Sequence, residues 1–319
     1  MNLLNHLSLF SAPMAGYTNI AFRELLRTFG GADLIATEMV SARSFVYMGN
    51  RNEEHPARLD GVREEQRPVS VQIWDNAPET LAKLANTLTN DYKVDVIDIN
   101  FGCPARQIAQ RSESGSALLR DPELVARIVR TVVQAASPTP VTAKIRLGTT
   151  RETINASEVA NAVEEAGASG ITVHGRTAAE MYRGKADWEE IAKVKPHLKR
   201  IPLIGNGDIK TAAEAVEKLK NYPVDGIMIG RGMLSNPYIF NQIKQFQENK
   251  TETQPDQKTI LLTYYNLAKK HFGKNAIKTI KTFAPQLITT KPNSKSIRTK
   301  LSKINNEQEF LQIMEEWKE

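Results

Sequence analysis

Short apolar runs alternate with longer amphipathic stretches along the first 240 residues. The runs are β-prone and predict eight strands, at 7–14, 33–39, 68–74, 95–100, 141–146, 170–174, 201–206 and 225–229. Between most of them, apolar residues recur at helical spacing, as over 20–29, 121–133, 155–166 and 211–220. Residues 41–66 predict a long irregular loop, and Asn76 with Glu79 predicts a capping box.

Strand–helix alternation at this count predicts a TIM (β/α)8 barrel, although a doubly wound sheet gives a similar pattern. Polar residues favour the barrel, because they fall where predicted strands end and those ends meet at one mouth. These residues are Pro13, Gln72, Asn100, Cys103, Lys144, Arg146, His174, Asn206 and Arg231. The barrel would occupy residues 1–246 and carry the catalytic site.

A polar segment at 247–257 predicts a linker, and residues 258–319 predict a small C-terminal helical domain. One of its helices would carry Lys274, Lys278 and Lys281 on a single face and end at Pro285. We expect a chain cut near Gln247 to fold without this domain.

The excess of positive charge lies in the C-terminal part of the chain. The chain has a net charge of +6, and between Lys258 and Lys303 there are eleven basic residues and no acidic one. Such a stretch favours a polyanionic partner.

Hydrophobic residues at 41% and charged residues at 24% are globular values, and no apolar run is long enough to span a membrane. The single cysteine, with no signal-peptide pattern, predicts a cytoplasmic location.

That cysteine, Cys103, lies between Gly102 and Pro104 just past a predicted strand. A lone cysteine is more often a buried core residue, but glycine and proline flanks favour a shaped, reactive loop. Glycine-rich strings after the last two strands contain Asn206, Gly207, Asp208, Gly230 and Arg231 and favour a phosphate, hence a cofactor such as FMN.

Lys144 and His174 end neighbouring predicted strands, where cations would stabilise a reduced flavin. Either residue could instead have only a structural role. Gln72 offers a donor and an acceptor to a flavin edge. No cluster of His, Cys and Asp has metal-ligand spacing, so we expect no metal.

Several strings together resemble the tRNA-dihydrouridine synthases, with the bacterial B-type members as the nearest branch. The resemblance covers nearly all of residues 10–240. It rests on the strings at 12–18, 100–104, 115–119, 144–148, 174–177, 182–188, 205–209 and 228–232. The tail matches only in kind, because the family ends in a small helical RNA-binding domain.

The resemblance implies a flavoenzyme that reduces the C5–C6 bond of uridine in tRNA. Hydride would pass from FMN N5 to C6 and a proton from Cys103 to C5, with NADPH reducing the flavin. The cofactor would be held by Pro13, Met14, Ala15, Gln72, Lys144, His174, Asn206, Gly207, Asp208, Gly230 and Arg231. The substrate would be held by Asn100, Arg146, Arg176, Lys274, Lys278 and Lys281.

Other functions stay open from the residues alone. The barrel could reduce a free pyrimidine or a ribosomal RNA uridine, or the chain could be a non-catalytic RNA-binding protein. The basic tail argues against a free base, and the polar mouth argues against a non-catalytic protein. We expect a monomer that binds tRNA and does not associate with a membrane.

Overall fold

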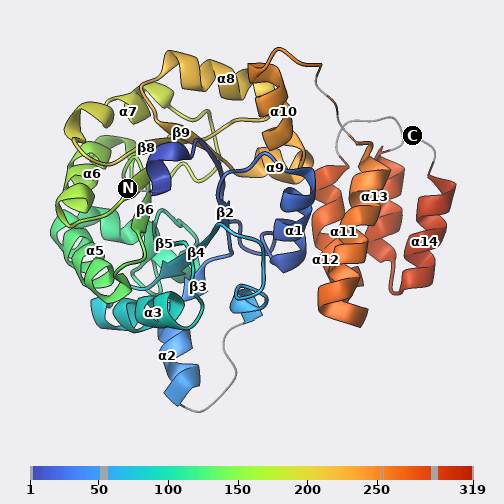
Figure 1. Ribbon diagram of the computed structural model, residues 1–319, viewed down its shortest axis with the longest axis horizontal. Helices are drawn as coiled ribbons and strands as arrows, with labels where there is room; N and C mark the ends of the chain where they lie inside the picture. Colours follow the sequence, from blue (N-terminus) through green and yellow to red (C-terminus); the bar gives the residue numbers. More distant parts are fainter. Residues whose placement is uncertain (1–2, 51–56, 252, 254, 289–293, 318–319) are drawn as a thin grey trace.

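The structure is a computed structural model that describes residues 3–50, 57–251, 253, 255–288 and 294–317 (Figure 1). Parallel strands form one sheet in the order β1-β9-β8-β7-β6-β5-β4-β2, and β3 pairs with β4 alongside. A parallel bridge between Phe10 and Leu34 joins the first strand to the second and closes the ring. The TIM-barrel prediction is therefore confirmed. The strands are β1 Leu9–Ser11, β2 Ile35–Ala36, β3 Val40–Ser41, β4 Val69–Trp74, β5 Val96–Phe101, β6 Val141–Arg146, β7 Gly170–His174, β8 Leu203–Asn206 and β9 Gly226–Ile229.

Helices surround the strands, as Figure 1 shows, and bury their apolar faces against the outside of the sheet. The first helix matches its prediction, because the Asn19 side chain accepts a hydrogen bond from the Phe22 N–H and Gly30 ends the helix. The barrel helices are α1 Ile20–Phe29, α2 Ala42–Asn50, α3 Pro78–Asn90, α4 Arg106–Ala109, α5 Pro122–Ala136, α6 Ala156–Glu165, α7 Trp188–Ala192, α8 Ala212–Asn221, α9 Arg231–Ser235 and α10 Ile239–Gln247.

The barrel interior changes character along its axis. A small apolar cluster that includes Phe10, Leu34 and Val96 fills one end. Side chains on one face of a strand lie two residues apart, so β5 turns Val96, Asp98 and Asn100 to the same side. The strand register sets Asn100 beside Lys144 on β6. The interior therefore becomes polar toward the carboxyl ends of the strands.

Several local predictions are wrong. The expected loop at 41–66 contains α2. Of the strand expected at 33–39, only Ile35–Ala36 forms a strand, β2, and the short β3 follows just beyond it at Val40–Ser41. The capping box at Asn76 does not form, because α3 begins at Pro78 with no side-chain cap, and the Asn76 Oδ1 accepts from Arg43 instead.

Short helices also follow two of the residues at the mouth of the barrel. The segment after Cys103 contains α4, and α9 begins at Arg231 directly after β9. In the tail, Pro285 lies inside a helix instead of ending it, and the helix continues to Leu287.

The tail is helical, with α11 Gln257–Phe272, α12 Ala276–Leu287, α13 Ser294–Lys303 and α14 Glu307–Glu316. Figure 1 shows α11 and α12 beside α1. The buried ring of Phe22 on α1 lies 6.4 Å from Tyr264 on α11 and 5.4 Å from Phe283 on α12, edge to face. Glu24 on α1 also pairs with Lys270 at 3.1 Å. Barrel and tail residues thus share one core, and the proposed domain boundaries stay a prediction.

Candidate active site

A cavity of about 520 Å³ opens at the carboxyl ends of the strands, within the size range of ligand pockets. It brings together most of the site residues predicted from the sequence, although their roles stay predictions. The predicted residues that line it are Pro13, Met14, Ala15, Gln72, Asn100, Cys103, Lys144, Arg146, His174, Asn206, Gly207, Asp208, Gly230 and Arg231.

The loop that carries Cys103 is held on both sides of its backbone. The Cys103 N–H donates to the Asn100 Oδ1 at 2.9 Å, and its carbonyl accepts from the N–H and hydroxyl of Ser116 at 3.1 and 3.0 Å. Gly115 has a φ of +58°, and a Cβ there would lie 2.8 Å from the Cys103 carbonyl oxygen. Glycine is therefore needed for this close approach.

Burial raises the pKa of the Cys103 thiol, against the opposing effects of the Ala105 N–H and the cations of Arg146 and Lys144. A thiol has an ordinary pKa of about 8.5, so Cys103 is protonated at neutral pH. It can therefore donate a proton to a molecule in the cavity.

A chain of hydrogen bonds runs from the barrel interior to this loop. Asn100 donates through Nδ2 to the Gln72 Oε1 at 2.8 Å, and Gln72 donates through Nε2 to the Asp98 Oδ2 at 2.7 Å. The Asp98 Oδ1 accepts from the Thr142 hydroxyl at 2.7 Å. The amide groups of Gln72 and Asn100 are thus engaged with the protein as well as facing the cavity.

Cations line the cavity wall next to this chain, on β6 and beyond. Lys144 donates to the Asn206 Oδ1 at 3.1 Å, and burial, together with Arg146, lowers its pKa to about 8. His174 is buried, and its burial and the nearby Lys144 and Arg146 hold its pKa well below the ordinary value. The imidazole is therefore neutral at pH 7, while Lys144 and Arg231 supply positive charge.

Asp208 orders the cavity rim after β8. It has a φ of +51°, accepts from Arg176 at 2.7 Å and lies 3.2 Å from the Arg231 guanidinium. The preceding Gly207 has a φ of +136°, and a Cβ there would lie 2.5 Å from the Ala186 Cβ. Only glycine fits at that position, so the turn after β8 can pack directly against Ala186.

Some predicted residues lie away from the cavity wall. Arg176 is 1% exposed and donates to the carbonyls of Arg183 and Gly184 as well as to Asp208, so it holds the rim in shape. Lys274 and Lys278 are exposed and Lys281 is half-buried, at or near α12 in the tail.

Other residues also line the cavity although the sequence analysis gave them no role, among them Tyr17, Met39, Tyr182 and Gln286. The half-exposed Tyr182 carries the Arg231 guanidinium 4.8 Å from its ring centroid. Its string, Tyr182-Arg183-Gly184, was part of the family resemblance and could have indicated it. Gln286 comes from α12 and donates to the Tyr17 hydroxyl at 3.3 Å, a contact between distant segments that no local pattern predicts.

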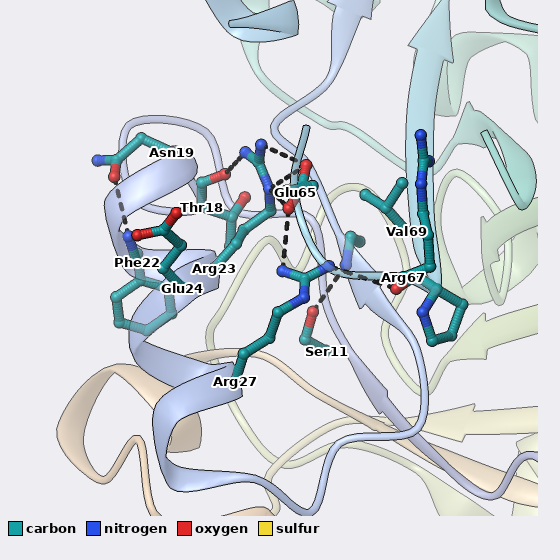
Figure 2. A network of polar contacts seen from close by, with 12 residues as sticks. Ser11, Thr18, Asn19, Phe22, Arg23, Glu24, Arg27, Glu65, Arg67 and Val69 are labelled. Carbon is teal, nitrogen blue, oxygen red and sulfur yellow. Dashed lines mark hydrogen bonds and ion pairs between the residues drawn. The ribbon is translucent and has the colours of Figure 1, made fainter. Parts of the chain in front are cut away.

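A buried ion-pair network supports the loop of Pro13 and Met14. Figure 2 shows Glu65 between Arg23, which it meets at 2.7 Å, and Arg27, at 2.9 Å. Arg23 also donates to the Thr18 carbonyl at 2.9 Å, and the Thr18 hydroxyl accepts from the Met14 N–H at 3.1 Å. Removing one partner of a buried pair typically costs about 3–5 kcal/mol, so this network fixes α1 and the Met14–Thr18 turn together.

Two kinds of site are absent from the described residues. No group of three or more His, Cys, Asp or Glu side chains is arranged to hold a metal ion there. Within the same residues, no helix combines the length and apolar character needed to cross a membrane.

A closed parallel barrel, with a cysteine and buried cations around a cavity at its carboxyl end, defines a (β/α)8-barrel enzyme. The family model described as "Dihydrouridine synthase (Dus)" matches residues 10–319. The chain therefore belongs to the dihydrouridine synthase family, and the resemblance noted in the sequence is confirmed.

Relatives described as probable tRNA-dihydrouridine synthases agree. The chain is 36% identical to the one from Rickettsia bellii over 83% of this chain and 80% of that protein. It is 33% identical to the one from Aquifex aeolicus over 97% and 95% of the two chains. Among solved structures, a morphinone reductase mutant in complex with tetrahydroNAD is similar in fold, with a TM-score of 0.52 and 13% identity over 79% of this chain and 90% of that one.

Proposed function

We propose that the protein reduces uridine in tRNA to dihydrouridine, with FMN as its cofactor and NADPH as its reductant. Family membership and the relatives' names support the reaction and the RNA substrate. The observation that carries the proposal is Cys103, a protonated thiol held at a cavity that also contains a buried lysine.

The residues present fit FMN. The cavity has a suitable volume, and Gly207 and Gly230 in its lining carry no side chain that would take up space in it. Arg231 and Lys144 line the cavity, where Arg231 would bind the phosphate and Lys144 would balance negative charge on the ring. When bound, FMN supplies the hydride that reaches uracil C6.

The chain itself would supply the proton and the positioning. Cys103 donates a proton to C5, and the positive charge of Lys144 helps to balance the thiolate that is left behind. Arg146 reaches the cavity while donating to the Gly102 carbonyl at 2.9 Å, so one side chain borders the uridine site and holds the cysteine loop.

Residues 258–319 would form the RNA-binding part. Lys269 and Lys300 are paired with Glu307 and Glu316, whereas Lys274 and Lys278 extend into solvent near α12. Exposed lysines can bind backbone phosphates of any sequence. The monomeric state and the cytoplasmic location stay predictions.

The test is a reaction with purified protein, NADPH and tRNA that lacks dihydrouridine, with free uridine and ribosomal RNA in parallel. We expect dihydrouridine in tRNA alone. Cys103→Ala should keep its flavin and its RNA affinity but react about 10²-fold more slowly or worse, as for loss of a general acid. Full turnover by Cys103→Ala would contradict the cysteine's role, and a colourless purified protein would contradict the flavin.

A further inference from the structure

Asp98 is a buried acid to which the proposed reaction gives no role. It lies on β5 between Ile97 and Ile99 and is 4% exposed. Each carboxylate oxygen has a partner at 2.7 Å, the Thr142 hydroxyl on one side and the Gln72 Nε2 on the other. Burial raises the pKa of Asp98, while these two hydrogen bonds and the charge of Lys144 oppose that rise.

The chain from Asp98 to Cys103 has a direction. An ionised carboxylate can only accept hydrogen bonds, so Gln72 must turn its NH2 group toward Asp98 and its oxygen toward Asn100. Asn100 must then give its NH2 group to Gln72. Its own oxygen is left facing the backbone N–H groups of Gly102, at 3.1 Å, and Cys103, at 2.9 Å.

The far end of the chain requires the same direction, because a backbone N–H can only donate. If Gln72 turned over, its NH2 group would face the NH2 group of Asn100. Asn100 would then have to turn as well and would place a donor against the N–H of Cys103. The loop would lose both hydrogen bonds that Asn100 now accepts.

We propose that Asp98 is a positioning residue for Cys103, which it holds in place by fixing the direction of the Gln72–Asn100 amide chain. The carboxylate acts through three hydrogen bonds and does not reach the substrate. Its importance for catalysis rests on the proposed function, but its effect on the cysteine loop does not.

The same loop is also held from other sides. Ser116 binds the Cys103 carbonyl, and Arg146 binds the Gly102 carbonyl at 2.9 Å. These contacts hold the carbonyls, whereas Asn100 holds the N–H groups. Reversing the amide chain should therefore loosen the loop without unfolding the barrel.

The test uses the thiol itself. Cys103 is the single cysteine of the chain, so alkylation by iodoacetamide reports on it alone. The rate is measured against pH for the wild type and Asp98→Asn at equal flavin content. The substituted side chain has the same size but can face Gln72 with either a donor or an acceptor. We expect alkylation of Asp98→Asn at neutral pH to be about tenfold faster than that of the wild type, because the freed loop exposes the sulfur. A tenfold increase is equivalent to a fall of about one unit in the apparent pKa of the thiol.

The matched control is Thr172→Val, which changes a buried polar residue of the same barrel interior, on β7. Its alkylation rate should stay within about twofold of the wild type, because Thr172 is not part of the hydrogen-bond chain from Asp98 to Cys103. Circular dichroism and thermal unfolding show whether each variant is folded.

A second variant moves the carboxylate instead of removing it. When Asp98→Asn is combined with Gln72→Glu, the carboxylate now at position 72 accepts from the amide at position 98 on one oxygen. Its other oxygen accepts from Asn100, which restores the direction. We expect the alkylation rate to return toward the wild-type value. An unchanged rate in Asp98→Asn, or a double variant as fast as the single one, would overturn the proposal.

The assay needs neither tRNA nor turnover, so its result is separate from that of the proposed function. If the wild type made no dihydrouridine while Asp98→Asn still freed the thiol, the reaction would be wrong and the positioning right. In turnover, Asp98→Asn should lower kcat and leave the KM for tRNA unchanged. An equal loss in Thr172→Val would indicate a general structural effect and overturn the positioning role.

Discussion

Replacing Lys274, Lys278 and Lys281 together by Gln should weaken tRNA binding in a salt-dependent way. The three lysines follow one another over two turns at or near α12, and two of them are exposed. Glutamine is close to lysine in helix propensity and remains polar, but it carries no charge.

The magnitude follows from counterion release. Each phosphate contact contributes about 0.7–0.9 to the slope of log K against log salt, so three lost contacts should flatten the slope by about 2–3. Extrapolated from 1 M salt, this difference is about 100-fold in affinity at 0.15 M and about fivefold at 0.5 M. Flavin content and the rate of flavin reduction by NADPH should not change.

The measurement is a titration of tRNA at several salt concentrations. The control variant replaces Lys83, Lys193 and Lys220, exposed residues on or next to the barrel helices α3, α7 and α8, and removes the same net charge. Its slope should match the wild type. If the tail variant keeps the wild-type slope, or the control loses as much, then the tail lysines do not bind the RNA backbone.

Four further outcomes are expected. Arg231→Ala should weaken FMN retention by about 10- to 100-fold and leave tRNA affinity unchanged, since a hydrogen bond to a charged group contributes about 1.5–3 kcal/mol; full retention after dilution would exclude a phosphate contact. The folded-state pKa of His174 lies below its unfolded value, so the unfolded chain binds the proton first as pH falls below 6.5. The free energy of unfolding should then drop by up to about 1.4 kcal/mol per pH unit, and His174→Gln should lessen that slope; an NMR titration of the ring near pH 6.5 would contradict this. Phe283→Ala should cost about 3–5 kcal/mol, far more than the more exposed Phe246→Ala, and thermal unfolding measures both. For the same reason a chain cut near Gln247 should be unstable, the reverse of the sequence-based expectation.

The sequence predicted the barrel well because each of its signals was local. Val141–Arg146 and Gly170–His174 match their strands end for end, and helices α5 and α7 begin at local caps, the Asp121 and Asp187 side chains. Wrong predictions arose where tertiary contacts decide. Residues 42–50 are helical although the stretch looked polar, and Asn76 binds Arg43 instead of capping α3.

The candidate site was predictable to the same extent. Residues that end parallel strands necessarily meet at one mouth, so Lys144 and His174 could be placed together in advance. Arg176 could not, because its direction depends on carbonyls contributed by 183–184. In the sequence, Asp98 is one polar residue within an apolar strand. Its hydrogen bonds to Gln72 on β4 and Thr142 on β6 are visible only in the structure.

The shared core of α1, α11 and α12 sets a fixed distance between the tail and the cavity. Gln286 borders the cavity, and Lys278 lies eight residues earlier on the same helix, about 12 Å away at 1.5 Å per residue. Because Phe22 packs against Phe283 of that helix, the separation between Lys278 and the cavity is fixed. If the tail binds the RNA backbone as proposed, a uridine would be selected by its distance from the bound phosphates in the folded RNA and not by the neighbouring sequence.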